Sequence, residues 1–169
     1  MRQVTKIPIK HHPSDLYFRV NTIDLIDKAR KEIRVVTGEF SILYFSDVLE
    51  AFREAIQNRN VTVEAYLGRC DVDTTNLAIV NNMIVYSGKK MPESGNHYMI
   101  VDRKHIIVSE KHVPYSVGER HGYVVQDNEK FAANWLTEFD SLKKKVKKPS
   151  TKLIDYRKKS RELIASIYN

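Results

Sequence analysis

The chain has 169 residues, of which 42% are hydrophobic and only 11 are glycine or proline (6 and 5), which fits one compact domain and excludes a fibrous or low-complexity chain. Its one cysteine, Cys70, excludes an internal disulfide and a cysteine-rich zinc site. The net charge is +7, and without a signal peptide or an apolar run of about 18 residues we expect a cytoplasmic protein with no membrane span.

The first half of the chain alternates apolar patterns of helix and strand. Asn21 and Thr22 offer an N-cap for an apolar stripe that starts at Ile23, which predicts the first helix. The predicted elements are a lead-in strand or turn over 14–20, a helix over 22–32, a strand over 33–38, a helix over 46–58, a strand over 61–67, a helix over 73–81 and a strand over 83–86. This alternation favours parallel strands joined by crossover helices.

The second half begins with a polar loop over 88–96. Two strands, 97–102 and 105–109, then form a hairpin. A loop over 113–121 and a strand over 122–126 follow. Asp127 or Asn128 caps a long helix to about 146, whose stripe is Phe131, Trp135, Phe139 and Leu142.

These elements predict an α/β fold: a mixed β-sheet flanked by helices on both faces. Pro149 and Ser150 break the long helix, and an extra C-terminal helix is expected over 151–167. We place the main domain at 1–148 and a basic helical extension at 149–169. The apolar stripe of the extension fits packing on the domain or a homodimer.

The positive charge is concentrated at the C-terminal end. Residues 142–169 carry ten lysines or arginines and two acids, whereas the rest of the chain carries 18 basic and 19 acidic residues. A polyanion such as nucleic acid would meet this end first. The candidate nucleic-acid-binding residues are Lys143, Lys144, Lys145, Lys147 and Lys148. Lysines at a helix C-terminus also complement the helix dipole, so the pattern alone leaves both explanations open.

The segment from Gly95 to Asp102, Gly-Asn-His-Tyr-Met-Ile-Val-Asp, resembles the phospholipase D superfamily. The motif of that family is H-x-K-x(4)-D, followed by a strand and then G-S-x-N. If Asp102 is aligned with the motif aspartate, Gly95 stands at the histidine position and His97 at the lysine position. The resemblance therefore implies a phospholipase D-like fold in a catalytically degenerate member.

A second alignment takes His97 as the family histidine. It puts Met99 at the lysine position and shortens the spacing to the aspartate. In the family, one histidine attacks phosphorus and a second protonates the leaving group. The resemblance thus implies His97 and Asp102 as candidate catalytic residues, although Asp102 also suits a hairpin turn.

The later motif of the family falls on Ser109 and the three residues after it. Glu110, Lys111 and His112 are the candidate residues for binding a ligand or its phosphate. His97, Glu110 and His112 have the right chemistry for zinc, but their spacing matches no metal signature, so we expect no metal and no cofactor. Lys89 and Lys90, together with Arg120 and His121, are expected at the same edge of the sheet.

Two functions follow from this comparison. The first is a non-catalytic or weakly catalytic domain that binds nucleic acid or another phosphorylated ligand. The second is a metal-independent phosphodiesterase or nuclease that uses His97 in place of the usual histidine. Single-motif members of the family pair as dimers to bring two motifs together, so the second function favours a homodimer.

Overall fold

The structure is a computed structural model that describes residues 4–9, 16–69, 71–110, 120–146, 148–150 and 152–155. For 4–9, 16–17 and 120–121 it describes the backbone alone. Within these ranges no helix is both long and apolar enough to cross a membrane.

A seven-stranded mixed sheet forms the centre of the described part, in the order β1-β7-β6-β5-β2-β3-β4. The strands are β1 (Val4–Ile9), β2 (Glu32–Thr37), β3 (Thr62–Leu67), β4 (Ile84–Ser87), β5 (His97–Val101), β6 (His105–Ser109) and β7 (Arg120–Val125). Strands β2, β3 and β4 are parallel, as the alternating pattern predicted, and the remaining neighbours are antiparallel.

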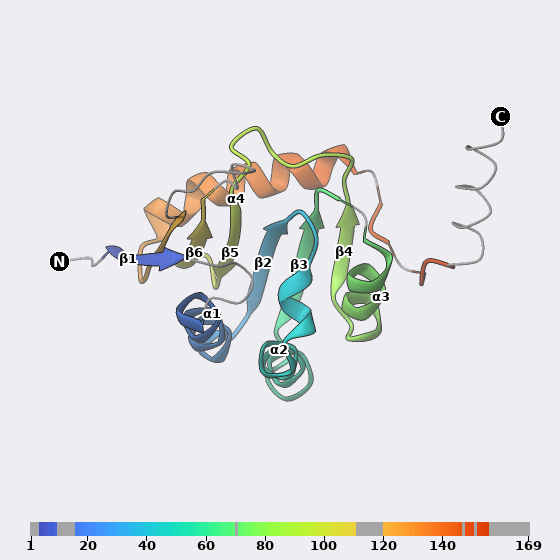
Figure 1. Cartoon of the computed structure of the whole chain (residues 1–169), viewed down its shortest axis with the longest axis horizontal. Helices are drawn as coiled ribbons and strands as arrows, with labels where there is room; N and C mark the ends of the chain where they lie inside the picture. The colour runs from blue at the N-terminus through green and yellow to red at the C-terminus, as the bar shows by residue number, and fades with distance from the viewer. Residues whose placement is uncertain are drawn as a thin grey trace.

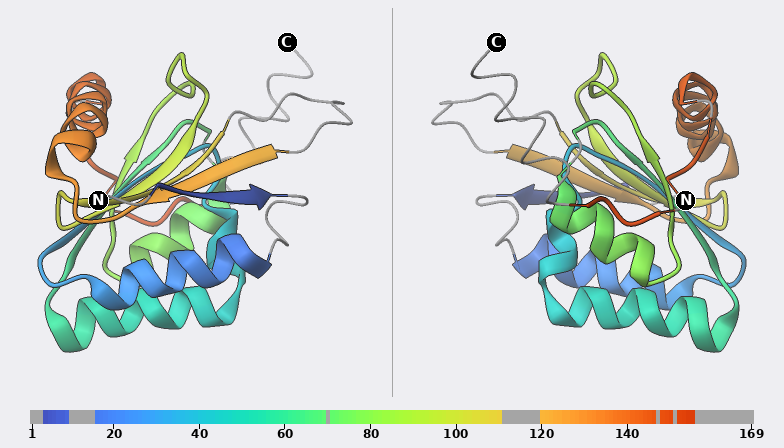
Figure 2. Two further views of the ribbon diagram at one scale, coloured as in Figure 1. Left: turned by 90° about the vertical axis from the view of Figure 1, so that its left-hand side faces the viewer. Right: turned by 90° about the vertical axis from the view of Figure 1, so that its right-hand side faces the viewer.

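Helices cover both faces of the sheet, which confirms the predicted fold class (Figures 1 and 2). The helices are α1 (Leu16–Lys28), α2 (Ser46–Arg59), α3 (Val72–Val80) and α4 (Glu129–Lys145), with a 3-10 helix, η1 (Ser41–Tyr44). The core under α1 and α2 includes Phe52 and Ile107, and a second core under α4 includes Ile100 and Phe139. Alternate residues of each strand therefore fill two different cores.

The start of the first helix was predicted wrongly. Residues 14–20 were expected as a strand or turn before a helix over 22–32, but α1 begins at Leu16 and ends at Lys28. Thr22 is not an N-cap, because its hydroxyl donates to the Phe18 carbonyl within the helix at 2.8 Å. A threonine inside a helix makes this bond to the residue four positions earlier.

Two other regions differ from the prediction. Strand β1 was not predicted, and β7 begins at Arg120, within the loop expected over 113–121. Residues 152–155 are not helical, so the helix expected over 151–167 does not begin at 151, and its remainder lies outside the described residues. Here Ser150 donates to the Val85 carbonyl of β4, and Ile154 exchanges two hydrogen bonds with the Asn76 side chain.

Candidate functional site

His97 lies at one end of the sheet, which we call the site edge. Strands β2, β3 and β4 end there at Thr37, Leu67 and Ser87 (Figure 1). Because β5 runs antiparallel to β2, it begins at the same edge with His97. In open sheets with parallel strands, ligands commonly bind beyond the carboxyl ends of the strands.

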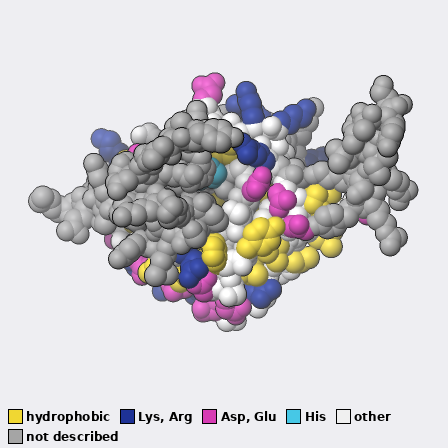
Figure 3. Space-filling model, in the orientation of Figure 1, with side chains coloured by type: hydrophobic (Ala, Val, Ile, Leu, Met, Phe, Trp, Pro, Cys, Tyr) yellow, Lys and Arg dark blue, Asp and Glu magenta, His cyan; other side chains and the backbone are white. Residues whose placement is uncertain are grey.

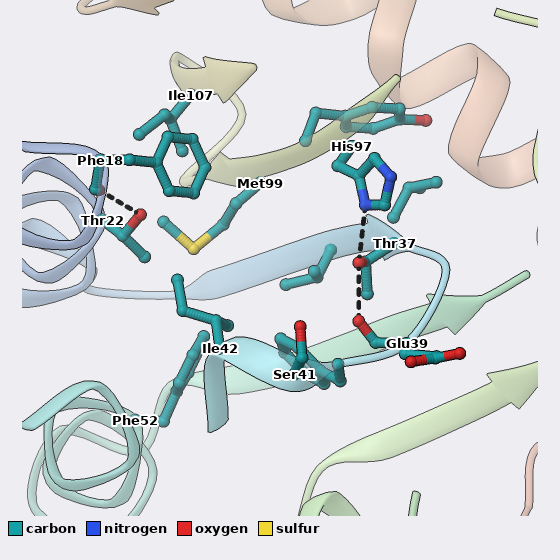
Figure 4. A pocket seen from close by; sticks show the side chains of 14 residues that line it. Phe18, Thr22, Thr37, Glu39, Ser41, Ile42, Phe52, His97, Met99 and Ile107 are labelled. Carbon is teal, nitrogen blue, oxygen red and sulfur yellow. Dashed lines mark hydrogen bonds between the residues drawn. The ribbon is translucent and has the colours of Figure 1, made fainter. Parts of the chain in front are cut away.

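The His97 ring is held in place by Thr37. The His97 Nδ1 atom lies 2.9 Å from the Thr37 hydroxyl oxygen, and that hydroxyl donates its proton to the Glu39 carbonyl at 3.0 Å (Figure 4). A hydroxyl has one proton, so toward His97 it acts as an acceptor and Nδ1 carries the hydrogen. In the neutral ring, Nε2 is then the basic nitrogen.

His97 stands over a small pocket on the α1 and α2 face of the sheet. The cavity has a volume of about 50 Å³. Thr37 and His97 supply polar atoms, whereas Phe18, Met99 and Ile107 supply apolar walls (Figure 4). A cavity of this size admits water or a small group rather than a whole nucleotide. A larger ligand would therefore contact His97 from the open side.

A buried serine lies opposite His97 on the neighbouring strand. Ser109 pairs with His97 in the β5-β6 ladder, so the two side chains share one face of the sheet. Ser109 is fully buried, and its hydroxyl has no hydrogen-bond partner among the described residues. Ser109 does not line the His97 pocket, so its hydroxyl is closed off from that cavity in this structure. Glu110 follows Ser109 and is exposed, whereas Lys111 and His112 lie outside the described residues.

The position two residues before His97 carries no side chain. Gly95 precedes β5 in a turn, where its N–H donates to the Pro92 carbonyl at 2.9 Å and its φ is 66°. Met99, two residues after His97, faces the apolar pocket. Neither alignment with the phospholipase D motif is therefore complete. The first has glycine for the histidine and His97 for the lysine, so only the aspartate matches, and the second has Met99 for the lysine and a shorter spacing to the aspartate.

Asp102 lies at the opposite edge of the sheet, about 16 Å from His97 along the five-residue strand β5. Its carboxylate accepts hydrogen bonds from the backbone N–H groups of Arg30, Lys31 and Glu32 at 2.8, 2.8 and 3.0 Å. Burial alone would raise the pKa of Asp102, but these bonds outweigh it and leave the pKa lowered. Asp102 thus joins the β5-β6 turn to the turn after α1.

The candidate lysines of the C-terminal end are divided between two environments. Lys143 lies over the sheet, where it pairs with Glu64 and sits 5.0 Å from the centre of the Tyr86 ring. Lys144, Lys145 and Lys148 are exposed. Lys147 lies outside the described residues. Lys143 therefore has a structural partner that the charge pattern did not reveal.

The described part of the chain contains no group of three or more histidine, cysteine, aspartate or glutamate side chains placed to hold a metal ion. Among the histidines whose side chains are described, His97 lies at the site edge and His105 at the opposite edge. His105 is buried, and its Nδ1 accepts a hydrogen bond from the Asp127 N–H.

The sequence matches no family model and no curated protein. Solved structures do match. Nuc of Salmonella typhimurium, a phospholipase D family member, is 17% identical with a TM-score of 0.60, over 83% of this chain and 93% of that chain. The chain has a phospholipase D-like fold. NucT of Helicobacter pylori is 10% identical with a TM-score of 0.57, over 84% of this chain and 96% of that one.

A DNA-binding protein shares the same phospholipase D-like fold. TrmBL2, an archaeal chromatin protein, is 14% identical with a TM-score of 0.61, over 85% of this chain and 53% of that one. At these identities the likeness shows the fold alone. The chain spans about half of TrmBL2, so what that protein does as a whole does not transfer to it.

Sequence reasoning missed Thr37 and Ser109. Thr37 ends a strand that was predicted, but nothing local shows that this strand pairs with the one that starts at His97. Ser109 was noted only as the first position of the later family motif. A polar residue at the end of an apolar strand was the available signal for both.

Proposed function

We propose that the chain is a phospholipase D-like domain that binds a phosphorylated ligand at the site edge without cleaving it. The observation that supports this proposal most strongly comes from the alignment anchored on Asp102. Gly95, at the position of the family nucleophile, has no side chain, and the oriented imidazole of His97 occupies the lysine position. An imidazolium there would contact a phosphate oxygen as a charged donor.

Other groups at the site edge support phosphate binding. The Ser109 hydroxyl, opposite His97 and without a partner among the described residues, would donate to a second oxygen once the ligand displaces the atoms that bury it. Lys111 and His112 are retained as proposed ligand contacts from the sequence, together with Glu110. Asp102 keeps its role at the opposite edge, so the proposed site does not include it. A cytoplasmic location is part of this proposal.

A second candidate function is a metal-independent phosphodiesterase or nuclease. The specific observation that favours it is the bond between His97 and Thr37, since it leaves Nε2 as the basic, nucleophilic nitrogen of the neutral ring. Cleavage also requires a proton donor for the leaving group, and a homodimer would bring a second imidazole for that step.

One assay separates the two functions. Bis-(4-nitrophenyl) phosphate and labelled single- and double-stranded DNA and RNA are incubated with the chain, with and without EDTA, and binding is read by gel shift. We expect binding without turnover, weakened in His97→Ala. Turnover that resists EDTA and is lost in both His97→Ala and Thr37→Val would replace the first function with the second.

Two controls make the assay decisive. Circular dichroism melts of His97→Ala and Thr37→Val show whether each variant is folded. Light scattering gives the oligomeric state under assay conditions. Unchanged phosphate binding by a folded His97→Ala variant would refute the proposed site.

A further inference from the structure

A second hollow at the site edge lies on the α4 side of the sheet, and we call it the lysine groove. Its volume is about 960 Å³. One wall is the loop over 88–93 between β4 and β5, and the other is the C-terminal end of α4 with the residues that follow. Figure 3 shows Lys and Arg side chains gathered along the upper rim of the molecule, near this loop and α4.

Four lysines line the groove, two from each wall. Lys89 and Lys90 come from the loop, and Lys145 and Lys148 come from the α4 side. All four are exposed, and none forms an ion pair with a carboxylate in the described part of the chain. Glu93 and Glu138 also line the groove, which leaves its lining with a net positive charge.

The helix dipole explains only part of this charge. Lysines in the last turn of α4 complement the dipole, and Lys143 already does so while paired with Glu64. Lys89 and Lys90 belong to a loop distant in sequence and have no such role. Their convergence with Lys145 is therefore a tertiary feature rather than a helix-end effect.

The loop wall is fixed to the sheet. The Tyr66 hydroxyl donates to the Lys90 carbonyl at 2.9 Å, and the Gly88 N–H donates to the Leu67 carbonyl at 2.8 Å. Gly68 leaves the space that Met91 occupies, since a Cβ there would lie 2.7 Å from the Met91 sulfur. A loop whose backbone is already held in place loses less entropy on binding than a loop that must first become ordered.

The lysine groove and the His97 pocket lie on opposite faces of the sheet and approach each other near Gly38, just beyond the end of β2. The Met91 sulfur and the His97 ring each lie 3.7 Å from the point that a Cβ on Gly38 would occupy. Met91 lines the groove and His97 lines the pocket. A ligand with several phosphates can therefore place one at His97 and others along the groove.

We infer that the lysine groove binds the phosphate backbone of a nucleic acid strand. This inference rests on the proposed function, because the groove would receive further phosphates of the ligand that contacts His97. Repeated phosphates suit four lysines spread over two walls, and lysine contacts to phosphates carry no sequence information. The expected binding is therefore independent of sequence and sensitive to salt.

The test is fluorescence anisotropy with a labelled 20-nucleotide single strand and its duplex over a range of salt concentrations. Lys89→Gln/Lys145→Gln removes one lysine from each wall. Lys31→Gln/Lys130→Gln, at exposed positions outside the groove, removes the same charge and serves as the matched control. We expect the groove variant to bind at least fivefold more weakly and the control to bind within twofold of the wild type.

The salt dependence gives a second readout. The slope of log K against log salt is negative, and each lost phosphate contact makes it shallower by about 0.7 for a single strand and about 0.9 for a duplex. The groove variant should thus lose roughly 1.4 in slope with the single strand. Equal losses in the two variants would mean that net charge alone drives binding, and would overturn the inference.

Two further binding experiments, one with His97→Ala and one with anionic vesicles, distinguish this inference from the proposed function. His97→Ala should weaken binding of a dinucleotide phosphodiester. For the 20-mer, its slope of log K against log salt should differ from that of the wild type by no more than about 0.7, the value for one phosphate contact. If His97→Ala has no effect but the groove variant does, the proposed site fails and the groove stands. Binding to vesicles with anionic lipid, in the absence of nucleic-acid binding, would overturn the groove assignment.

Discussion

Asp102 tests whether the end of the sheet opposite His97 stabilises the fold and takes no part in ligand binding. Its carboxylate accepts three backbone N–H bonds from the turn that leads into β2, and its φ of 49° lies in the left-handed region. Asp102→Gly removes both acceptor oxygens and with them all three hydrogen bonds, and glycine adopts this φ without strain. Asp102→Asn keeps one oxygen and a side chain that tolerates this φ.

The expected loss can be worked from these bonds. A hydrogen bond to a charged group contributes about 1.5–3 kcal/mol, but two of the three here are exposed to water, which replaces the lost acceptor. We therefore expect about 3 kcal/mol for Asp102→Gly and about half of that for Asp102→Asn. For a chain of this size the first value corresponds to a Tm lower by roughly 6–12 °C.

The assay is urea unfolding followed by circular dichroism, combined with gel shift on the folded variants. The difference between wild type and Asp102→Gly should narrow as the pH falls below about 3.9, because the lowered pKa of Asp102 contributes stability only while the carboxylate is charged. Ligand binding should stay unchanged. Wild-type stability in Asp102→Gly, or lost binding in a folded variant, would refute this reasoning.

Three further predictions concern other parts of the fold. Burial lowers the pKa of His105 against the opposing charge of Asp127, so wild-type stability should fall as the pH drops below about 6.5, and urea midpoints of His105→Gln should lack this part of the pH dependence. Lys143→Met should destabilise the chain by about 1 kcal/mol because the half-buried Glu64 keeps Arg34 and Tyr86 but loses its lysine partner, whereas Lys144→Met should lie within about 0.5 kcal/mol of wild type in the same unfolding assay. Gly88→Ala should lower the Tm, because the new Cβ would lie 2.1 Å from the Tyr66 hydroxyl, and an unchanged melt would mean that the loop wall is not fixed as described.

Local patterns were enough to predict most of the central sheet. The apolar runs that became β2, β3 and β4 and the hairpin of β5 and β6 are each recognisable alone, and their alternation with helices sets the parallel order. Strand β1 was not predicted because it is an edge strand that contains Pro8 and pairs with β7, which lies far along the chain. No local signal specifies such a pairing.

The candidate site was predictable only in part. His97 stood out by chemistry and by its place in the phospholipase D motif, but its contact with Thr37 depends on the antiparallel pairing of β2 and β5. Likewise, the charge pattern grouped Lys143 with Lys145, although one pairs with Glu64 and the other lines the lysine groove. Helix periodicity alone cannot say which lysine faces the sheet.

The most direct test of the proposed phosphate site is the nitrogen NMR spectrum of the His97 ring during titration with a dinucleotide phosphodiester. In the free protein we predict that Nδ1 carries the hydrogen, because the Thr37 hydroxyl accepts from it. On titration the Nε2 resonance should shift toward that of a protonated ring, and Thr37→Val should abolish the preference for Nδ1. An Nε2 resonance that does not move while the dinucleotide binds would contradict the proposed site.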